Sequence, residues 1–198
     1  MSFLHNLYHW VMAATSHHAS DTPAPNPPAV TPAPIAILPE PAEAGSTITL
    51  TGDDTCTPEE ISRIPQIVAA IYKAILDPKF KEYFCDPANG LDLGQTNGLT
   101  AEQVVNVIRT TKVVAVLSFY YAGFSKVIGY RNPDENIIHC NRKYHDGYTP
   151  EQEADNDLHE ITHLMNFDHD FDLTPRRPFS VPYMANKAFE YVMGISAD

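Results

Sequence analysis

The sequence is poor in cysteine, in basic residues and in long hydrophobic runs, and each shortage excludes a class of protein. Its 198 residues include three cysteines, too few for a disulfide scaffold or for a zinc site built from four thiolates. Lys and Arg number 13 against 25 Asp and Glu, and the net charge of -12 opposes contact with nucleic-acid phosphates. No run approaches the roughly 20 apolar residues that a membrane-spanning helix needs. We therefore expect no nucleic-acid partner and no transmembrane segment.

Proline is unevenly distributed, and it divides the chain into parts. Eight of the 17 prolines lie between Pro23 and Pro41, where they favour an extended, semi-rigid spacer over a packed element. Residues 21–45 are therefore interpreted as a linker, and residues 46–198 as one folded domain. Residues 1–20 carry apolar side chains at helical spacing and are expected to form a short amphipathic or targeting segment. Export or secretion is favoured, although this segment lacks the basic residues that open a signal peptide.

The residues after the linker predict three helices and a small sheet, which is an α+β fold. Each predicted helix follows a threonine that can cap it, with Glu or Gln three residues later: Thr57 with Glu60, Thr100 with Gln103, and Thr149 with Gln152. The first helix is expected to end near residue 76 and the third near residue 166, while the second is short. Residues 113–121 are β-branched and aromatic and predict a central strand, followed by shorter strands over residues 126–130 and 136–141.

The three cysteines leave two interpretations open. Cys56 and Cys85 flank the first predicted helix, so they can form a disulfide if the protein meets an oxidising compartment. Equally, both of them and Cys140 can be reduced residues that serve only in packing.

The third predicted helix carries a motif with metal-binding chemistry. His159 and His163 stand four residues apart, so both imidazoles project from one face of the helix, with Glu160 beside them. Two neutral imidazoles can bind Zn²⁺, and a neighbouring carboxylate can act as general base for hydrolysis. His169 follows six residues later, about 9 Å further along a straight helix. It can share the metal only if the helix ends and turns back, and Asn166 is the residue suited to the left-handed conformation of such a turn.

The pattern H-E-x-x-H-x-x-N-x-x-H, over residues 159–169, resembles the motif of the metzincin zinc endopeptidases, in which the turn residue is usually Gly. The resemblance implies a small mixed sheet with backing helices, a zinc-binding helix, a methionine-containing turn and a C-terminal helix. It also implies one catalytic Zn²⁺ held by His159, His163 and His169, with Glu160 as general base. Met184 would be the methionine of the turn. Asn186 occupies the position at which some of these families carry a tyrosine, and Tyr183 precedes the methionine instead.

By the same resemblance, the expected reaction is hydrolysis of a protein or peptide substrate by a monomeric enzyme. The strand over residues 136–141, with Ile137, Ile138 and His139, would be the edge strand along which an extended substrate binds. Some metzincins are kept latent by a thiolate or carboxylate from an upstream segment. Three residues near the start of the folded part are candidates for such a role: Cys56, Asp53 and Asp54.

Other interpretations of the motif remain open at this point. The third ligand can be an aspartate, and three aspartates follow His163 closely: Asp168, Asp170 and Asp172. The same ligands can serve another zinc hydrolase, such as a cell-wall amidase or peptidase. A catalytically silent module that holds zinc and binds peptides is the third possibility, although a structural zinc has no use for Glu160 as general base.

Overall fold

A computed structural model describes residues 47–132, 134–170 and 173–195. The segments expected over residues 1–20 and 21–45, and Asp172, lie outside these residues. Within them, the fold is a mixed α+β fold with a four-stranded sheet and six α-helices. The elements in chain order are β1 (Ile48–Gly52), α2 (Pro58–Leu76), α3 (Pro78–Cys85), α4 (Ala101–Thr110), β2 (Val113–Tyr120), β3 (Gly129–Arg131), β4 (Ile137–Asn141), α5 (Arg142–His145), α6 (Pro150–Leu164) and α7 (Val181–Met193), with 3-10 turns at Pro87–Asn89, Leu93–Gln95 and Arg177–Phe179.

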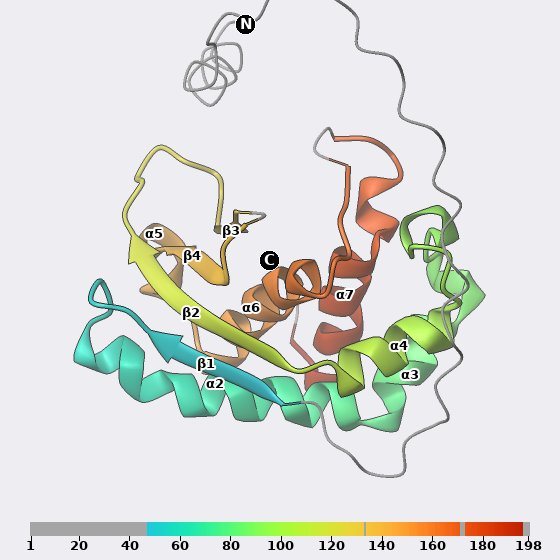
Figure 1. The fold of residues 1–198 in the computed structure, drawn as a ribbon, viewed down its shortest axis with the longest axis horizontal. Helices are drawn as coiled ribbons and strands as arrows, with labels where there is room; N and C mark the ends of the chain where they lie inside the picture. Colours follow the sequence, from blue (N-terminus) through green and yellow to red (C-terminus); the bar gives the residue numbers. More distant parts are fainter. Residues whose placement is uncertain (1–46, 133, 171–172, 196–198) are drawn as a thin grey trace, which may run out of the picture. The chain divides into compact units, whose positions relative to one another are not determined.

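The sheet has the strand order β1-β2-β4-β3, and only β3 runs antiparallel to its neighbour. Alternate residues of β2 are buried, from Val113 to Phe119, whereas Val114 on the other face is half exposed. This alternation indicates that the helices pack against one face of the sheet. Figure 1 shows α2 running alongside β1, and α6 crossing the same group of strands.

The capping signals in the sequence correctly located three helices. Thr57, Thr100 and Thr149 each accept a hydrogen bond from the backbone N–H three residues later, and the Glu or Gln at that position bonds back to the threonine N–H. Helix α3 was not predicted, although Asp77 caps its first turn and proline follows directly. Strand β1 was not predicted either: its apolar and polar residues alternate, but the alternation covers only five residues and two apolar side chains.

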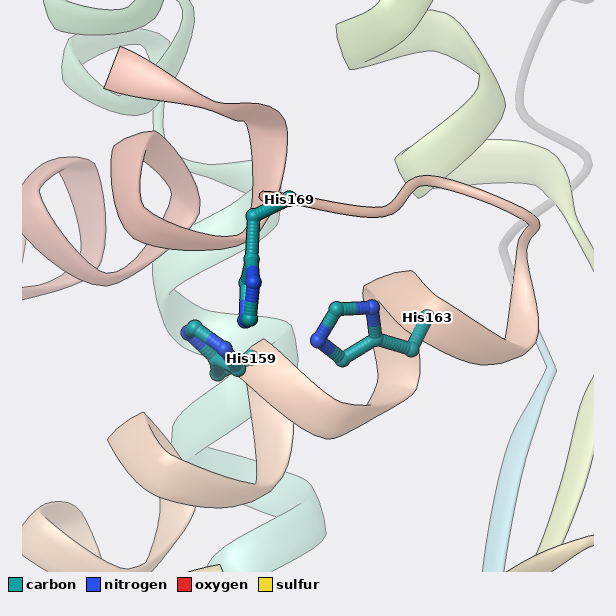
Figure 2. Close-up of side chains that lie close together, drawn as sticks. All are labelled: His159, His163 and His169. Atoms are coloured by element: carbon teal, nitrogen blue, oxygen red, sulfur yellow. The ribbon is translucent and has the colours of Figure 1, made fainter. Parts of the chain in front are cut away.

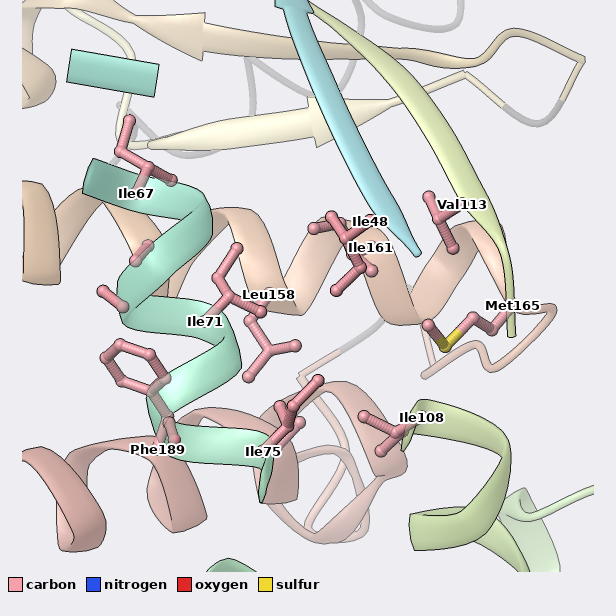
Figure 3. Packing of buried hydrophobic residues seen from close by; sticks show 14 of the residues in the cluster. Ile48, Ile67, Ile71, Ile75, Ile108, Val113, Leu158, Ile161, Met165 and Phe189 are labelled. Carbon is pink, nitrogen blue, oxygen red and sulfur yellow. The ribbon is translucent and has the colours of Figure 1, made fainter. Parts of the chain in front are cut away.

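The hydrophobic core lies between the buried face of the sheet and helices α2, α6 and α7. Figure 3 shows Ile48 of β1 and Val113 of β2 directed toward Ile161 of α6. On its other side α6 contributes Leu158, which lies near Ile71 of α2. Helix α6 therefore belongs to the core along much of its length, and this fixes the direction in which its remaining faces point.

Strand β4 was expected to be an edge strand, and this prediction is wrong. Its residues, including Ile137, Ile138 and His139, pair with β2 on one side and with β3 on the other. The turn formers at residues 132–136 allow the chain to fold back, so β3 pairs antiparallel with β4 and becomes the edge. The two edges of the sheet are therefore β1 and β3.

Cys56 and Cys85 do not form the disulfide that was one of the two expectations. Both are free thiols, and the 19-residue helix α2, about 28 Å long, lies between Cys56 and the short helix that Cys85 ends. The Cys56 thiol instead donates to the carbonyl oxygen of Leu117 at 3.3 Å. Among the described residues, no helix is both long and apolar enough to cross a membrane.

Candidate metal centre

Helix α6 presents His159, Glu160 and His163 as the sequence predicts. The four-residue spacing places both histidines on one side, whereas Leu158 and Ile161 turn toward the core. The histidine-bearing face is partly exposed, and the Glu160 side chain is buried, with 5% of its surface exposed. Because the opposite face is held in the core, the orientation of the two imidazoles is set by packing.

A Schellman turn ends the helix and brings His169 back to it. Asn166 has φ of +66°, the left-handed conformation that the sequence predicts for this position. The N–H groups of Asn166 and Phe167 donate to the carbonyl oxygens of His163 (3.0 Å) and Thr162 (3.1 Å), which is the hydrogen-bond pattern of this motif. Phe167 is buried and anchors the chain after the turn.

The three histidines converge, as Figure 2 shows. One nitrogen atom from each of His159, His163 and His169 lies within 4.8 Å of the others, and these three residues form the cluster able to hold a metal ion among the described residues. A tetrahedral zinc with bonds of about 2.1 Å needs its ligand nitrogens about 3.4 Å apart. Small side-chain adjustments would therefore bring the histidines into coordination distance.

Each histidine uses its Nδ1 atom for a hydrogen bond. His159 Nδ1 lies 2.7 Å from Oδ1 of Asn186, and His163 Nδ1 lies 2.8 Å from the Phe167 carbonyl oxygen. His169 Nδ1 lies 3.1 Å from the Asp170 carbonyl oxygen. Since carbonyl oxygens only accept, the Nδ1 atoms carry the protons and the Nε2 atoms keep their lone pairs for a metal. This donor set suits zinc.

The surroundings keep the imidazoles neutral. Burial lowers the pKa of His159 to about 3, and the neighbouring His163 adds to this effect. Burial also lowers the pKa of His163 and of His169, although Asp168 opposes the shift of His163. A neutral imidazole is the form that binds a metal ion, so ligation requires little displacement of protons at neutral pH.

Glu160 has the properties of an acid-base group. Burial raises its pKa to about 7, and the positive charge of Arg131 limits the rise. Arg131 belongs to the edge strand β3, and its Nη1 donates to the His163 carbonyl oxygen at 2.6 Å. A carboxyl group with a pKa near neutrality can both accept and return a proton.

Met184 was expected to lie in a turn beneath the metal, and this prediction is wrong. Ser180 begins helix α7, Pro182 favours its first turn, and the Met184 N–H donates to the Ser180 carbonyl oxygen as in a regular helix. Met184 is fully buried in the core. Its neighbour Tyr183 instead lies against the histidine cluster, with its ring centroid 4.8 Å from that of His159 and 5.2 Å from that of His169.

Two of the three aspartates considered as alternative ligands, Asp168 and Asp170, are among the described residues, and both accept hydrogen bonds from protein groups. Asp168 accepts a hydrogen bond from His163 Nδ1 at 3.1 Å, and the Asp170 carboxylate accepts one from Thr174. Neither belongs to the histidine cluster. The candidates for a latency device, Cys56, Asp53 and Asp54, are also outside it, because they lie in the loop that joins β1 to α2.

Two supporting residues could not be assigned from the sequence, because their partners are far away along the chain. Asn186 contacts a histidine 27 residues before it, and Arg131 contacts one 32 residues after it. The one feature of the sequence that drew attention to Asn186 was its position two residues after Met184, where some metzincin families carry a tyrosine.

Comparisons with protein-family models, with curated proteins and with solved structures found no match for this chain. The resemblance to metzincins therefore rests on the motif over residues 159–169 and on the order of the elements.

Proposed function

We propose that this protein is a zinc-dependent endopeptidase of metzincin type. The observation that carries the proposal is the convergence of three neutral histidines, each with a free Nε2 lone pair, beside the buried carboxyl group of Glu160. A structural zinc site has no need of an acid-base group, whereas hydrolysis does. Zinc, when bound, would polarise the scissile carbonyl group and increase the acidity of a water molecule.

The histidines and Glu160 would have different roles in the reaction. His159, His163 and His169 would hold the ion and leave one position open for substrate. Glu160 would take a proton from the attacking water and deliver it to the leaving amine, for which its pKa of about 7 is suited.

The arrangement of the sheet supports a peptide as the substrate. Strand β3 is one of the two edge strands, the other being β1, and Arg131 connects β3 directly to the end of α6. An extended peptide that pairs with β3 by main-chain hydrogen bonds would run close to the histidines. The small mixed sheet with an antiparallel edge, the zinc helix and the C-terminal helix α7 agree with the metzincin order of elements.

The proposal is tested by cleavage of casein and of a diverse peptide library by the full chain loaded with zinc. We expect cleavage that o-phenanthroline abolishes. Glu160→Gln should lower the rate at least about 100-fold while the protein still binds one zinc ion. Glu151→Gln, in the first turn of the same helix, is the matched control and should retain activity.

Two results would contradict the proposal. If the wild-type protein binds zinc but cuts neither casein nor the library, the endopeptidase assignment is wrong, and a narrow-specificity hydrolase or a peptide-binding module replaces it. If the wild-type protein binds no zinc, the metal centre itself is wrong.

A further inference from the structure

One side chain of helix α7 makes a hydrogen bond to a histidine of the metal centre. His163 and His169 donate their Nδ1 protons to carbonyl oxygens that lie within four residues of them. His159 differs, because its Nδ1 partner is the amide oxygen of Asn186, which is 27 residues away on α7. The orientation of this ligand therefore depends on long-range packing between α6 and α7.

The orientation of the Asn186 amide is fixed by its other contacts. Its Nδ2 lies 2.8 Å from the backbone carbonyl oxygen of Asp155 and 2.8 Å from the Asp155 carboxylate. A backbone carbonyl oxygen can only accept, so the NH₂ group must face Asp155 and the amide oxygen must face His159. It follows that His159 Nδ1 carries the proton and that Nε2 is free to bind a metal.

We infer that Asn186, held by Asp155, is a positioning residue that sets the zinc affinity of the site by fixing the tautomer and ring orientation of His159. The inference rests on the zinc site of the proposed function, although it does not require that the protein be a peptidase. Hydrogen-bond partners of this kind commonly change metal affinity 10- to 100-fold. Asp155 has the supporting role, because without it the amide could rotate and present its NH₂ group to His159.

The test compares a variant that removes the hydrogen-bond acceptor with an exchange variant that keeps it. In Asn186→Leu, the acceptor is lost at nearly constant volume. In the exchange variant, Asp155→Asn, the new side-chain oxygen and the backbone carbonyl oxygen of residue 155 can both still accept from Asn186 Nδ2, so Asn186 keeps its amide oxygen toward His159. Asn106→Leu, at a partly exposed position on α4, is the matched control.

Zinc affinity would be measured on the full chain by competition with a fluorescent chelator. We expect Asn186→Leu to bind zinc about 10 to 100 times more weakly, and both the exchange variant and the control to stay within about threefold of wild type. The second measurement is ¹⁵N NMR of the zinc-free protein. His159 should show the Nδ1–H form in wild type and in the exchange variant, and a shift toward Nε2–H in Asn186→Leu.

The inference is overturned if folded Asn186→Leu binds zinc within twofold of wild type and keeps the Nδ1–H form. Should that variant fail to fold, Asn186→Ala, which removes the same acceptor without adding a bulky side chain, is measured in its place. Weaker zinc binding with a shift toward Nε2–H supports the role, and retained affinity and tautomer in a folded protein refute it. Failure of the proposed function gives a different result, in which Asn186→Leu weakens zinc binding but the wild-type protein cuts no peptide.

Discussion

Tyr183 lies beside the three histidines but is not one of the candidate metal ligands. Its ring packs against His159 and His169, and its hydroxyl oxygen accepts a hydrogen bond from Arg177 Nε at 2.9 Å. Because the oxygen is already an acceptor, the hydroxyl proton is directed elsewhere. The donated bond from a guanidinium also makes the phenol a stronger donor.

We predict that Tyr183→Phe lowers the turnover number at least about tenfold, because it removes a donor that can stabilise the negative charge of the transition state. Zinc affinity should be unchanged, because no hydrogen bond to a histidine is lost. Steady-state kinetics on a peptide found in the library screen would measure the effect. Tyr191→Phe, an exposed position on the same helix, is the control. Equal turnover in both variants would exclude this role.

At the scale of elements, the turn after α6 determines whether the third histidine reaches the other two. Asn166 is exposed, so its contribution comes from backbone conformation and not from packing. The Asn97 side chain holds the turn from outside by donating to the Asn166 carbonyl oxygen at 2.7 Å.

We predict that Asn166→Val destabilises the protein by about 1 to 2 kcal/mol, the cost of the left-handed conformation for a residue with a side chain of this kind. Zinc binding should weaken in parallel, because His169 loses its position. Asn166→Gly should change the stability by less than about 1 kcal/mol, because glycine adopts this conformation freely. Urea unfolding of the zinc-free variants gives the comparison. A valine variant as stable as the glycine variant would show that the turn is not under this constraint.

Apart from helix α3, whose local cap at Asp77 was missed, the sequence predicted the elements whose signals are local, and it failed where the outcome depends on strand pairing. Capping boxes at Thr57, Thr100 and Thr149 act within four residues, and so does the turn at Asn166, so all four were found. The edge position of β3 depends on which strands pair, and this is not encoded in a strand of three residues. Met184 was misplaced for a related reason. The motif suggested a turn, but Pro182 at the start of α7 favours a helix there.

At the scale of the whole molecule, the ion pair between Glu60 and Arg142 joins distant parts of the chain. Both oxygens of Glu60, at the start of α2, accept hydrogen bonds from the Arg142 guanidinium at the start of α5, at 2.9 and 3.0 Å. The two residues are 82 positions apart. Burial alone would raise the pKa of Glu60, but the hydrogen bonds from Arg142 and Thr57 outweigh it and lower the pKa.

This pair predicts a loss of stability in acid. A carboxyl group whose pKa is lower in the folded state stabilises the fold above its unfolded pKa of about 4.3, and the contribution disappears as the pH falls through the folded value. Glu60→Gln should cost about 2 kcal/mol at pH 7 and progressively less below pH 4. Thermal unfolding of both proteins from pH 3 to 7, with a chelator present, measures the difference. A difference in stability between wild type and Glu60→Gln that does not change with pH would contradict this explanation.

If the proposed function is right, zinc should stabilise the whole protein, because the three histidines that would bind it belong to α6 and to the segment that leads to α7. At a free zinc concentration of 100 times the dissociation constant, the gain is about 2.7 kcal/mol. Chelation should therefore lower the melting temperature of the wild-type protein, whereas His169→Ala, which lacks one ligand, should respond much less. Calorimetric scans with and without a chelator give the comparison. The same shift in both proteins would indicate binding elsewhere.

The short chain distance between the histidines has a consequence for the order of folding. His159, His163 and His169 span 11 residues, and the turn that joins them is stabilised by bonds within that span. Such contacts have low contact order, so we expect them to form before the pairing of β1 with β2, which are joined across three helices. If the proposed zinc site is right, a nascent chain would bind zinc weakly as soon as α6 has formed. Its zinc affinity would rise only when α7 packs against α6 and Asn186 forms its hydrogen bond with His159. The zinc affinity would therefore measure whether this late step of folding is complete.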